Sequence, residues 1–356
     1  MQIGCVQLLD FRNYRTLSYR PSARLNLLTG RNAQGKTNAL EAVGVLLTGR
    51  SFRTTRLGEL PTWGSEVAVL TGELQRAEGS RTLRRTLQRR ENGTWQAAGE
   101  TCPWARVIAF GWQDLAIVHG SPSARRSFID GFAARLYPSH LSALLRYRRL
   151  LEQRNRMLQT RATAERLAPW DEQVATVGME LIDRRRRAVA ALHTELARVY
   201  SSLAGTGQHL SGESQKVQIA YRSAVGEATE PAALVAALEK ARPVELRRGQ
   251  TLVGPHRDDL AIELDGVDAR AFGSRGQQRL LVLALRLAEV LPVTEAAGTT
   301  PVLLLDDALS ELDPGVRDNV LREIQSAEQV FLTSPESLAV SGAARWNVDG
   351  GGIAAA

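Results

Sequence analysis

The chain has 356 residues, enough for two domains, and its 45 Lys and Arg against 38 Asp and Glu give a net charge of +7. This balance favours polyanionic partners such as nucleic acids. No run of 18 apolar residues occurs and the N-terminus enters a strand pattern directly, which predicts neither a membrane span nor a signal peptide. Cys5 and Cys102 are the only cysteines, so we expect free thiols and a cytoplasmic protein.

The first motif is a glycine-rich loop between a strand and a helix. Residues 1–9 and Leu25 to Thr29 have strand patterns, and Asn38 to Leu47 has helical spacing. The G-x-x-x-x-G-K-T segment between them predicts a phosphate loop for ATP, with a chance turn as the alternative. Backbone N–H groups would surround the phosphates, Lys36 would reach the β and γ phosphates, and Thr37 would place its hydroxyl on Mg²⁺. The predicted binding residues are Gly30, Arg31, Asn32, Ala33, Gln34, Gly35, Lys36, Thr37 and Asn38.

A strand-rich layer and then a helical region follow. Residues 66–97 alternate apolar and polar side chains around a turn at Glu91-Asn92-Gly93, which predicts an antiparallel layer. Residues 123–204 show helical spacing, interrupted at Pro138 and Pro169. This region is dense in arginine, either as a solvated helix face or as contacts to phosphates. The arginines in question are Arg146, Arg148, Arg149, Arg154, Arg156 and Arg184 to Arg187.

The next stretch has short elements. Residues 205–212 have the composition of a linker. Strand patterns are expected at 216–222, 251–253 and 260–264, with a helix at 231–240 and a hairpin turn at Asp265-Gly266. Residues 205–212 are uninformative about chemistry, and no internal repeat is visible in the chain.

Two further motifs lie near the C-terminus. The turn from Phe272 to Gln278 precedes a helical pattern that starts at Arg279, a geometry suited to anions. The apolar run from Val302 to Leu305 is typical of a buried parallel strand and ends in two acids. We expect Asp306 to hold Mg²⁺ and Asp307 to orient or deprotonate the attacking water, with an ordinary strand end as the alternative.

The order of these motifs resembles the ABC ATPase head. Phosphate loop, Ser-x-Gly-Gln-Gln turn, paired acids and Ser310-Glu311-Leu312-Asp313 follow one another, and Pro314 opens the next helix. The resemblance implies that Ser274, Gly276 and Gln277 of one subunit bind the ATP held by another, so the protein would be an ATP-dependent homodimer. It would also place Asp313 at the dimer seam. The alternative is a capped helix in which Ser274 is only a turn residue.

Four other segments narrow the resemblance. Asp306 lies 269 positions after Thr37, so about one small domain is inserted. Residues 10–14, 51–54, 111–130 and 254–259 resemble the RecF family of bacterial recombination mediators over nearly the whole chain. This resemblance implies DNA binding at single-stranded gaps, junctions or duplex, a slow DNA-stimulated ATPase activity, and help to RecR and possibly RecO in loading RecA.

The chain departs from the expected patterns at three places. Trp112-Gln113 stands where these relatives usually have Pro-Glu or Pro-Asp, so a metal-contacting and catalytic role for Gln113 rests on the wider ABC pattern, against a surface turn. Thr333-Ser334 stands near the position of a phosphate-sensing His in transporter heads, which implies slow hydrolysis. His256 would either contact phosphate or orient its loop.

The expected fold is an α/β ABC-type head, with a mixed core sheet and an antiparallel layer, plus an inserted and mainly helical lid. The expected ranges are 1–120 and 247–356 for the head and 121–246 for the lid. A transporter nucleotide subunit would have a shorter spacing between its motifs. A head of the structural-maintenance type would need heptads at the insertion, which Pro138 and Pro169 oppose.

Overall fold

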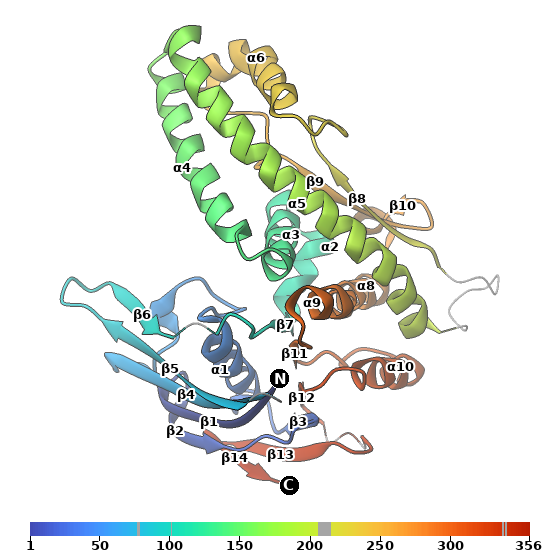
Figure 1. The fold of residues 1–356 in the computed structure, drawn as a ribbon. Helices are drawn as coiled ribbons and strands as arrows, with labels where there is room; N and C mark the ends of the chain where they lie inside the picture. The colour runs from blue at the N-terminus through green and yellow to red at the C-terminus, as the bar shows by residue number, and fades with distance from the viewer. Residues whose placement is uncertain (77–78, 101, 206–214, 337, 339) are drawn as a thin grey trace. The chain divides into compact units, whose positions relative to one another are not determined.

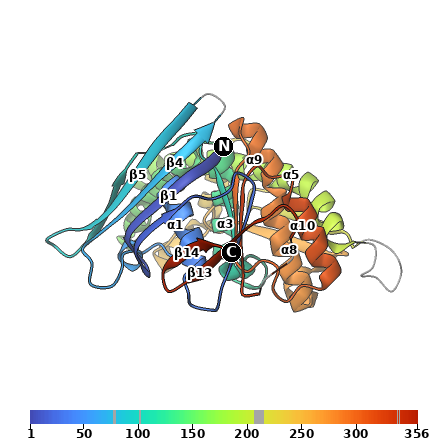
Figure 2. The same cartoon turned by 90° about the horizontal axis from the view of Figure 1, so that it is seen from below.

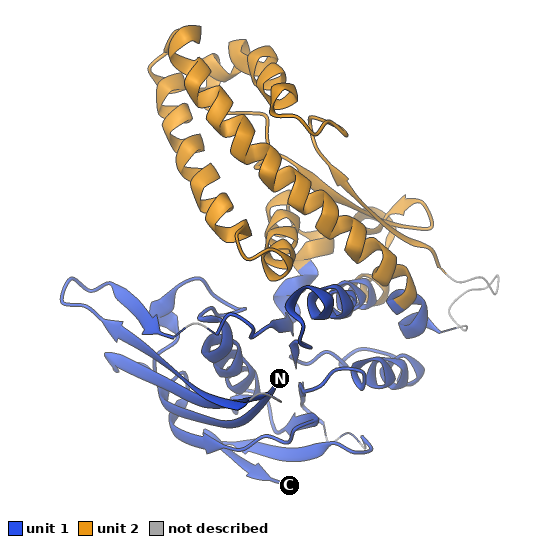
Figure 3. Cartoon of the chain, viewed as in Figure 1, with its two compact units in different colours: residues 1–115, 199–214, 279–356 blue, residues 116–198, 215–278 orange. Residues whose placement is uncertain are grey.

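The structure, a computed structural model, describes residues 1–76, 79–100, 102–205, 215–336, 338 and 340–356 (Figure 1). The chain forms two compact units (Figure 3). Unit 1 contains residues 1–115, 199–214 and 279–356, and unit 2 contains residues 116–198 and 215–278. Residues 247–278, expected with the head, therefore cluster with unit 2. The linker expected at 205–212 lies outside the described residues except for Gly205.

Unit 1 begins with a five-stranded antiparallel sheet in the order β2-β1-β4-β5-β6 (Figures 1 and 2). Ala68, Leu70 and Leu74 of β4 are buried on its inner face, as the alternating sequence predicts. The predicted hairpin turn is confirmed between β5 and β6, where Gly93 has φ +77°. The strands are β1 (Gln2–Phe11), β2 (Tyr14–Tyr19), β4 (Val67–Arg76), β5 (Gly79–Arg89) and β6 (Trp95–Gly99).

The second sheet of unit 1 has the order β14-β13-β3-β12-β11-β7. All neighbouring strands are parallel except β13 and β14. Because β3, β12, β11 and β7 are parallel neighbours, their carboxyl ends lie along one edge, where ligands bind in open α/β sheets. The strands are β3 (Leu25–Thr29), β7 (Val107–Phe110), β11 (Val302–Leu305), β12 (Val330–Ser334), β13 (Ala344–Asp349) and β14 (Gly352–Ala355).

Helix α1 (Lys36–Thr48) lies between these two sheets and contacts strands of both. Leu40, Val43 and Leu46 of α1 join one core with Leu70 of the antiparallel sheet and Leu304 of the parallel one. Helices α9 (Val290–Ala297) and α10 (Pro314–Ile324) lie on the other side of the parallel sheet (Figures 1 and 2). Helix α1 is therefore packed between the antiparallel and the parallel sheet.

Unit 2 combines helices with a small antiparallel sheet of order β10-β9-β8. Its elements are α2 (Ala116–His119), α3 (Pro122–Leu136), α4 (His140–Gln159), α5 (Ala164–Ala204), β8 (Val217–Arg222), α6 (Pro231–Arg248), β9 (Asp259–Leu264), β10 (Val267–Asp268) and α7 (Ala269–Phe272). α5 continues past residue 198 into unit 1, and α8 (Arg275–Ala288) starts in unit 2 and ends in unit 1. In unit 1, short 3-10 helices cover Leu57–Glu59 and Trp112–Leu115.

Three expectations about these elements were wrong. Pro169 does not interrupt the helix, because it lies in the second turn of the 41-residue α5, close to the helix start where few backbone bonds are lost. Residues 251–253 form no strand, since Thr251 instead bonds side chains of Asn155 and Arg154. α8 begins at Arg275, four residues before the predicted start.

Two arginines of unit 2 are neither solvated nor available to phosphates. Arg154 is fully buried and bonds Asp171 and Glu245, each at 2.7 Å. Arg185 is also buried and holds both oxygens of Asp130 at 2.8 Å. Buried arginines need paired acids because desolvating a charge is costly. The remaining arginines stay candidates for DNA contacts, with Arg148, Arg149 and Arg156 exposed on α4.

Cys5 and Cys102 are both buried free thiols, as expected. Across the described ranges, no helix is long and apolar enough to cross a membrane.

Candidate nucleotide site

The phosphate loop of residues 30–37 connects β3 to α1 at the carboxyl edge of the parallel sheet. β12 and β11 follow β3 in the sheet, so Thr333 and the acids Asp306 and Asp307 lie along the same edge. Gln113 follows β7, one strand further. The strand order thus brings motifs far apart in the sequence together.

Two loop positions require glycine. Gly30 has φ +151°, and a Cβ there would lie 2.3 Å from the carbonyl oxygen of Val348. Gly35 has φ +118° at the N-cap of α1, and its Cβ would lie 2.6 Å from Asn13 Nδ2. A side chain at either position would both strain the backbone and collide with unit 1.

The strand pair β1 and β2 supports the loop, a role that the sequence reasoning missed. The Tyr14 hydroxyl donates to the carbonyl of Gly35 at 3.0 Å, and Asn13 Nδ2 donates to the carbonyl of Gln34 at 3.0 Å. Asn38 Nδ2 donates to Asn13 Oδ1 at 2.8 Å. The amide of Asn38 is therefore engaged with the loop's own support. The only advance signal was the family-like segment 10–14.

Lys36 lies across the mouth of the loop. Its Nζ donates to the carbonyl oxygens of Gly30 at 2.6 Å and Arg31 at 3.0 Å. Partial burial lowers the pKa of Lys36, and the charges of Asp307 and Asp306 oppose that shift. The ammonium is thus held at the loop, near both acids, by backbone groups rather than by a salt bridge.

Thr37 and Asp306, which were both expected to hold Mg²⁺, lie within hydrogen-bonding distance of each other. Thr37 Oγ1 donates to the Asp306 carboxylate, 2.8 and 2.9 Å from its two oxygens. Burial raises the pKa of Asp306, while the hydrogen bonds from Thr37 and Thr333 act in the opposite direction. A hydroxyl beside a carboxylate is a hard oxygen donor set that fits Mg²⁺, which keeps most of its waters and needs few protein ligands. Among the described residues, no group of three or more His, Cys, Asp or Glu is placed to hold a metal ion.

Asp307 lies at the solvent side of the same edge. It is exposed and adopts a left-handed conformation with φ +53°. Its carbonyl accepts a bond from Arg279 Nη2 at 2.6 Å, and that same Nη2 lies 2.7 Å from Ser310 Oγ. The backbone that carries this acid is therefore fixed, while its side chain faces the open edge.

Two family-like segments converge on Glu41 of α1, which is fully buried. Arg12 binds both of its oxygens at 2.8 Å, and Arg53 Nη1 lies 3.1 Å from Oε2. Arg53 also donates to Asn38 Oδ1 at 2.8 Å. These contacts link residues 10–14 and 51–54 to the phosphate-loop helix. Sequence reasoning singled out both segments but not the acid that joins them.

Gln113 lies in the 3-10 helix after β7. Its Nε2 donates to the carbonyl of Phe52 at 2.9 Å. The next residue, Asp114, pairs with Arg286 at 2.6 Å. Gln113 is thus anchored at one end, next to the strand that pairs with β11.

The signature residues form a turn of their own in unit 2. Ser274 Oγ accepts from the N–H of Gln277 at 3.3 Å, and Gln277 Oε1 accepts from the N–H of Ser274 at 2.9 Å. This reciprocal arrangement is a capping box at the start of α8. Ser274 and Gly276 are exposed, and no described atom lies within 4 Å of a Cβ built on Gly276. The chain's own packing therefore gives no reason for glycine there.

His256 is held inside unit 2 by both ring nitrogens. Nδ1 lies 2.8 Å from the Tyr147 hydroxyl and Nε2 lies 3.0 Å from the carbonyl of Thr251. Burial lowers its pKa to about 4. A neutral ring that accepts from Tyr147 and donates to Thr251 satisfies both contacts. This geometry supports the loop-orienting interpretation over the phosphate one.

Acidification should destabilise the protein through His256. The unfolded histidine takes up a proton near pH 6.5, whereas the folded one does so only near pH 4, so its contribution is present above pH 6.5 and is lost on acidification. From pH 7 to pH 5 the expected loss in the free energy of unfolding is about 2 kcal/mol. Urea unfolding at both pH values checks this in the wild type and in His256→Gln, which does not titrate. An equal loss in both proteins contradicts the prediction.

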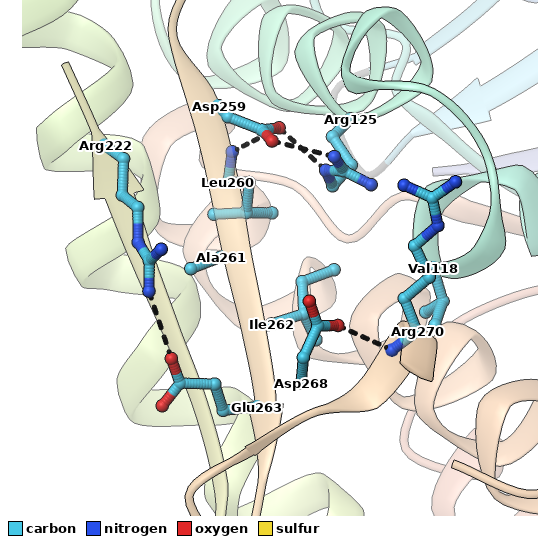
Figure 4. A pocket seen from close by; sticks show the side chains of 10 residues that line it. All are labelled: Val118, Arg125, Arg222, Asp259, Leu260, Ala261, Ile262, Glu263, Asp268 and Arg270. Carbon is cyan, nitrogen blue, oxygen red and sulfur yellow. Dashed lines mark hydrogen bonds and ion pairs between the residues drawn. The ribbon is translucent and has the colours of Figure 1, made fainter. Parts of the chain in front are cut away.

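A pocket of about 220 Å³ lies in unit 2 beside β9 (Figure 4). Arg125 binds both oxygens of Asp259 at 2.7 Å, and Arg222 pairs with Glu263. With Asp268 and Arg270, the lining has three acids and three arginines. This balance does not suit a nucleotide phosphate, so the candidate site remains the edge of the parallel sheet in unit 1.

Comparisons with known proteins agree on one family. The family model described as the RecF/RecN/SMC N terminal domain matches residues 2–347. A "DNA replication and repair protein RecF" from Desulforudis audaxviator (strain MP104C) is 38% identical over 374 residues, covering 99% of each chain. A solved structure of the recombination mediator protein RecF-ATP in the RecFOR pathway has a TM-score of 0.87 at 26% identity, covering 99% of both chains.

The fold extends to more distant proteins. A crystal structure of an Smc head bound to the C-winged helix domain of ScpA has a TM-score of 0.57 at 14% identity, covering 100% of this chain and 98% of that one. This likeness confirms the predicted mixed α/β head fold. The chain therefore belongs to the RecF family of DNA replication and repair proteins, within the RecF/RecN/SMC N-terminal domain family.

Proposed function

We propose that this protein is a recombination mediator that clamps DNA when ATP joins two of its heads. The observation that carries the proposal is the Thr37 to Asp306 contact at the foot of a complete phosphate loop. That pair is what a head needs to hold a nucleotide with its metal. In this proposal unit 1 is the ATPase head and unit 2 the lid.

ATP would bind along residues 30–38, with its phosphates against the loop N–H groups and the start of α1. Lys36 would exchange its two carbonyl partners for the β and γ phosphates. Thr37 and Asp306 would hold Mg²⁺, which neutralises phosphate charge during phosphoryl transfer. The hydroxyl and the buried carboxylate already lie within bonding distance of each other, which supports this assignment.

Hydrolysis would rest on Asp307 and Gln113. Asp307 would orient the attacking water or accept its proton, because its carboxylate faces the open edge beside Lys36. Gln113 would turn its Oε1 toward the metal or the water while Nε2 stays bonded to Phe52. Phosphoryl transfer depends mostly on such positioning and on charge neutralisation. We propose a slow ATPase stimulated by DNA.

The signature turn would act on the ATP of a second copy. Ser274, Gly276 and Gln277 lie at the start of α8, where the helix dipole favours phosphate. The absence of close described neighbours around Gly276 supports a role outside the chain's own packing. ATP would thus stabilise a homodimer with two shared sites.

The proposed substrate is DNA at single-stranded gaps, junctions or duplex, bound without sequence preference. The net charge of +7 and the exposed arginines of α4 support such binding. RecR and RecO would be the partners, as the pathway named for the solved relative suggests. The predicted cytoplasmic location agrees with this role.

Sedimentation with and without ATP and gapped DNA tests the proposal. The wild type should be a monomer without ATP and a DNA-bound dimer with it. Asp307→Asn should still bind ATP and Mg²⁺, because Asp306 remains, but hydrolyse ATP at least about 10-fold more slowly and stay on DNA as a trapped dimer. Asp318→Asn, at an exposed position of α10, is the matched control. Hydrolysis by Asp307→Asn at the wild-type rate would show that the acid roles are misassigned.

A further inference from the structure

Thr333 lies at the point where β12 meets the two acids. Thr333 is 1% exposed, and its strand β12 lies between the phosphate-loop strand β3 and the acid-bearing strand β11. Oγ1 lies 2.9 Å from Asp306 Oδ1 and 2.8 Å from the backbone nitrogen of Asp307. One buried hydroxyl therefore contacts both acidic residues.

The chemistry of these two contacts fixes their direction. An ionised carboxylate only accepts hydrogen bonds, so the Thr333 hydroxyl hydrogen goes to Asp306. The Asp307 N–H only donates, so it uses a lone pair of the same oxygen. The two bonds can therefore form at the same time.

The contact between the Asp307 N–H and Thr333 matters because of the backbone conformation of Asp307. Asp307 has φ +53°, a conformation that a residue with a Cβ adopts only when its surroundings hold it. Thr333 holds its N–H, and Arg279 and Ser310 bond its carbonyl. Without the Thr333 oxygen, the N–H of Asp307 would lose its hydrogen-bond acceptor on the buried side of this turn. The orientation of the Asp307 carboxylate would then be less restricted.

We propose that Thr333 is a positioning residue that sets the Asp306 carboxylate and the Asp307 backbone together. The effect on metal binding and ATP hydrolysis rests on the proposed function. The two hydrogen bonds of Thr333 do not depend on that function. Thr37 bonds Asp306 from the α1 side and Thr333 bonds it from the β12 side, so the carboxylate is held between two hydroxyls. Only the Thr333 hydroxyl also reaches the next acid.

Thr333→Val tests this assignment because it replaces the hydroxyl with a methyl group of similar size. Hydrogen exchange by mass spectrometry, on a peptide that contains Asp307, should show faster exchange of that amide in the apo protein. With ATP present, the affinity for Mn²⁺, measured by electron paramagnetic resonance as a probe for Mg²⁺, should fall about 10-fold or more. ATP hydrolysis should fall by a similar factor.

Thr333→Ser should restore all three measurements toward wild type, since it keeps the oxygen and loses only a methyl group. Thr294→Val removes a hydroxyl that bonds the carbonyl of Val290 on α9. It controls for the general effect of a threonine-to-valine substitution. Unchanged amide exchange and Mn²⁺ affinity in Thr333→Val would overturn the inference, as would equal losses in the serine variant. Failure of the wild type to bind ATP would instead refute the proposed function and leave the exchange result standing.

Discussion

Lys36→Ala should abolish nucleotide binding, with the affinity for ATP falling roughly 100-fold or more, because removing a charge that faces phosphates costs several kcal/mol. Lys36 is the cation fixed by the loop's own carbonyls at 2.6 and 3.0 Å. The alanine leaves those carbonyls turned toward the phosphate position with nothing to screen them. Dimerisation should disappear with ATP binding, because the nucleotide is the proposed link between the heads.

Titration calorimetry with ATP and Mg²⁺ measures this effect. Lys240→Ala is the matched control, because Lys240 is exposed on α6 in unit 2 and removes the same charge from the protein. The variant should also keep its fold, since Lys36 bonds two backbone carbonyls and forms no ion pair among the described residues that its loss would leave unbalanced. Wild-type affinity in Lys36→Ala would refute the phosphate-loop assignment.

The phosphate loop and the acids were predictable because each is a local pattern with a strand beside it. Residues 25–38 hold strand, loop and helix start in one continuous segment, and Val302 to Asp307 hold a buried strand and its acids. Because both patterns were expected to supply a ligand to one Mg²⁺, Thr37 and Asp306 were expected to lie close together. Similarly, the alternation in residues 66–97 was sufficient to predict the antiparallel sheet.

The supports of the site were not predictable in the same way. Thr333 contacts the two acidic residues only because β12 lies between β3 and β11 in the sheet. No local sequence pattern predicts that strand order. Tyr14 and Asn13 contact the loop because β1 and β2 lie beside it. Nothing in the sequence around Glu41 indicates that two arginines distant in the sequence bind it. Such contacts depend on tertiary arrangement rather than on residue type.

Arginine density misled the sequence interpretation for a related reason. Arg154 and Arg185 stand in runs that read as exposed or phosphate-binding, yet both are buried against acids 17 and 55 positions away in the chain. A helical arginine on the buried side can enter the core only where acids from other elements meet it. Whether an arginine is buried or exposed therefore depends on its acidic partner, and that partner lies outside the local sequence around the arginine.

A shared site predicts an asymmetry between the loop and the signature turn. The loop, Thr37 and Asp306 are assembled within unit 1, so ATP should bind a single chain. Ser274 and Gly276 are exposed at a turn that is already satisfied by its own capping bonds. Changes at the turn should therefore spare ATP binding and affect only what needs a second chain.

Ser274→Arg should bind ATP normally but fail to dimerise, because a bulky cation would occupy the space meant for the partner's γ-phosphate. DNA retention and ATP hydrolysis should fall together, each by about 10-fold or more, since both need the closed dimer. Light scattering, calorimetry and phosphate release measure the three effects. Ser274→Ala separates the loss of the cap, about 1 kcal/mol of helix stability, from the effect of bulk. Ser121→Arg places the same cation at the exposed N-cap of α3.

Mixing Ser274→Arg with Lys36→Ala subunits provides the sharpest form of this prediction. The first variant keeps an intact phosphate loop and the second keeps an intact signature turn, so each mixed dimer regains at most one shared site. Hydrolysis should be faster in the mixture than in either variant alone, and it should stay below the wild-type rate per dimer. Wild-type hydrolysis by monomeric Ser274→Arg would mean that the turn does not act across a dimer, and that each chain completes its own site.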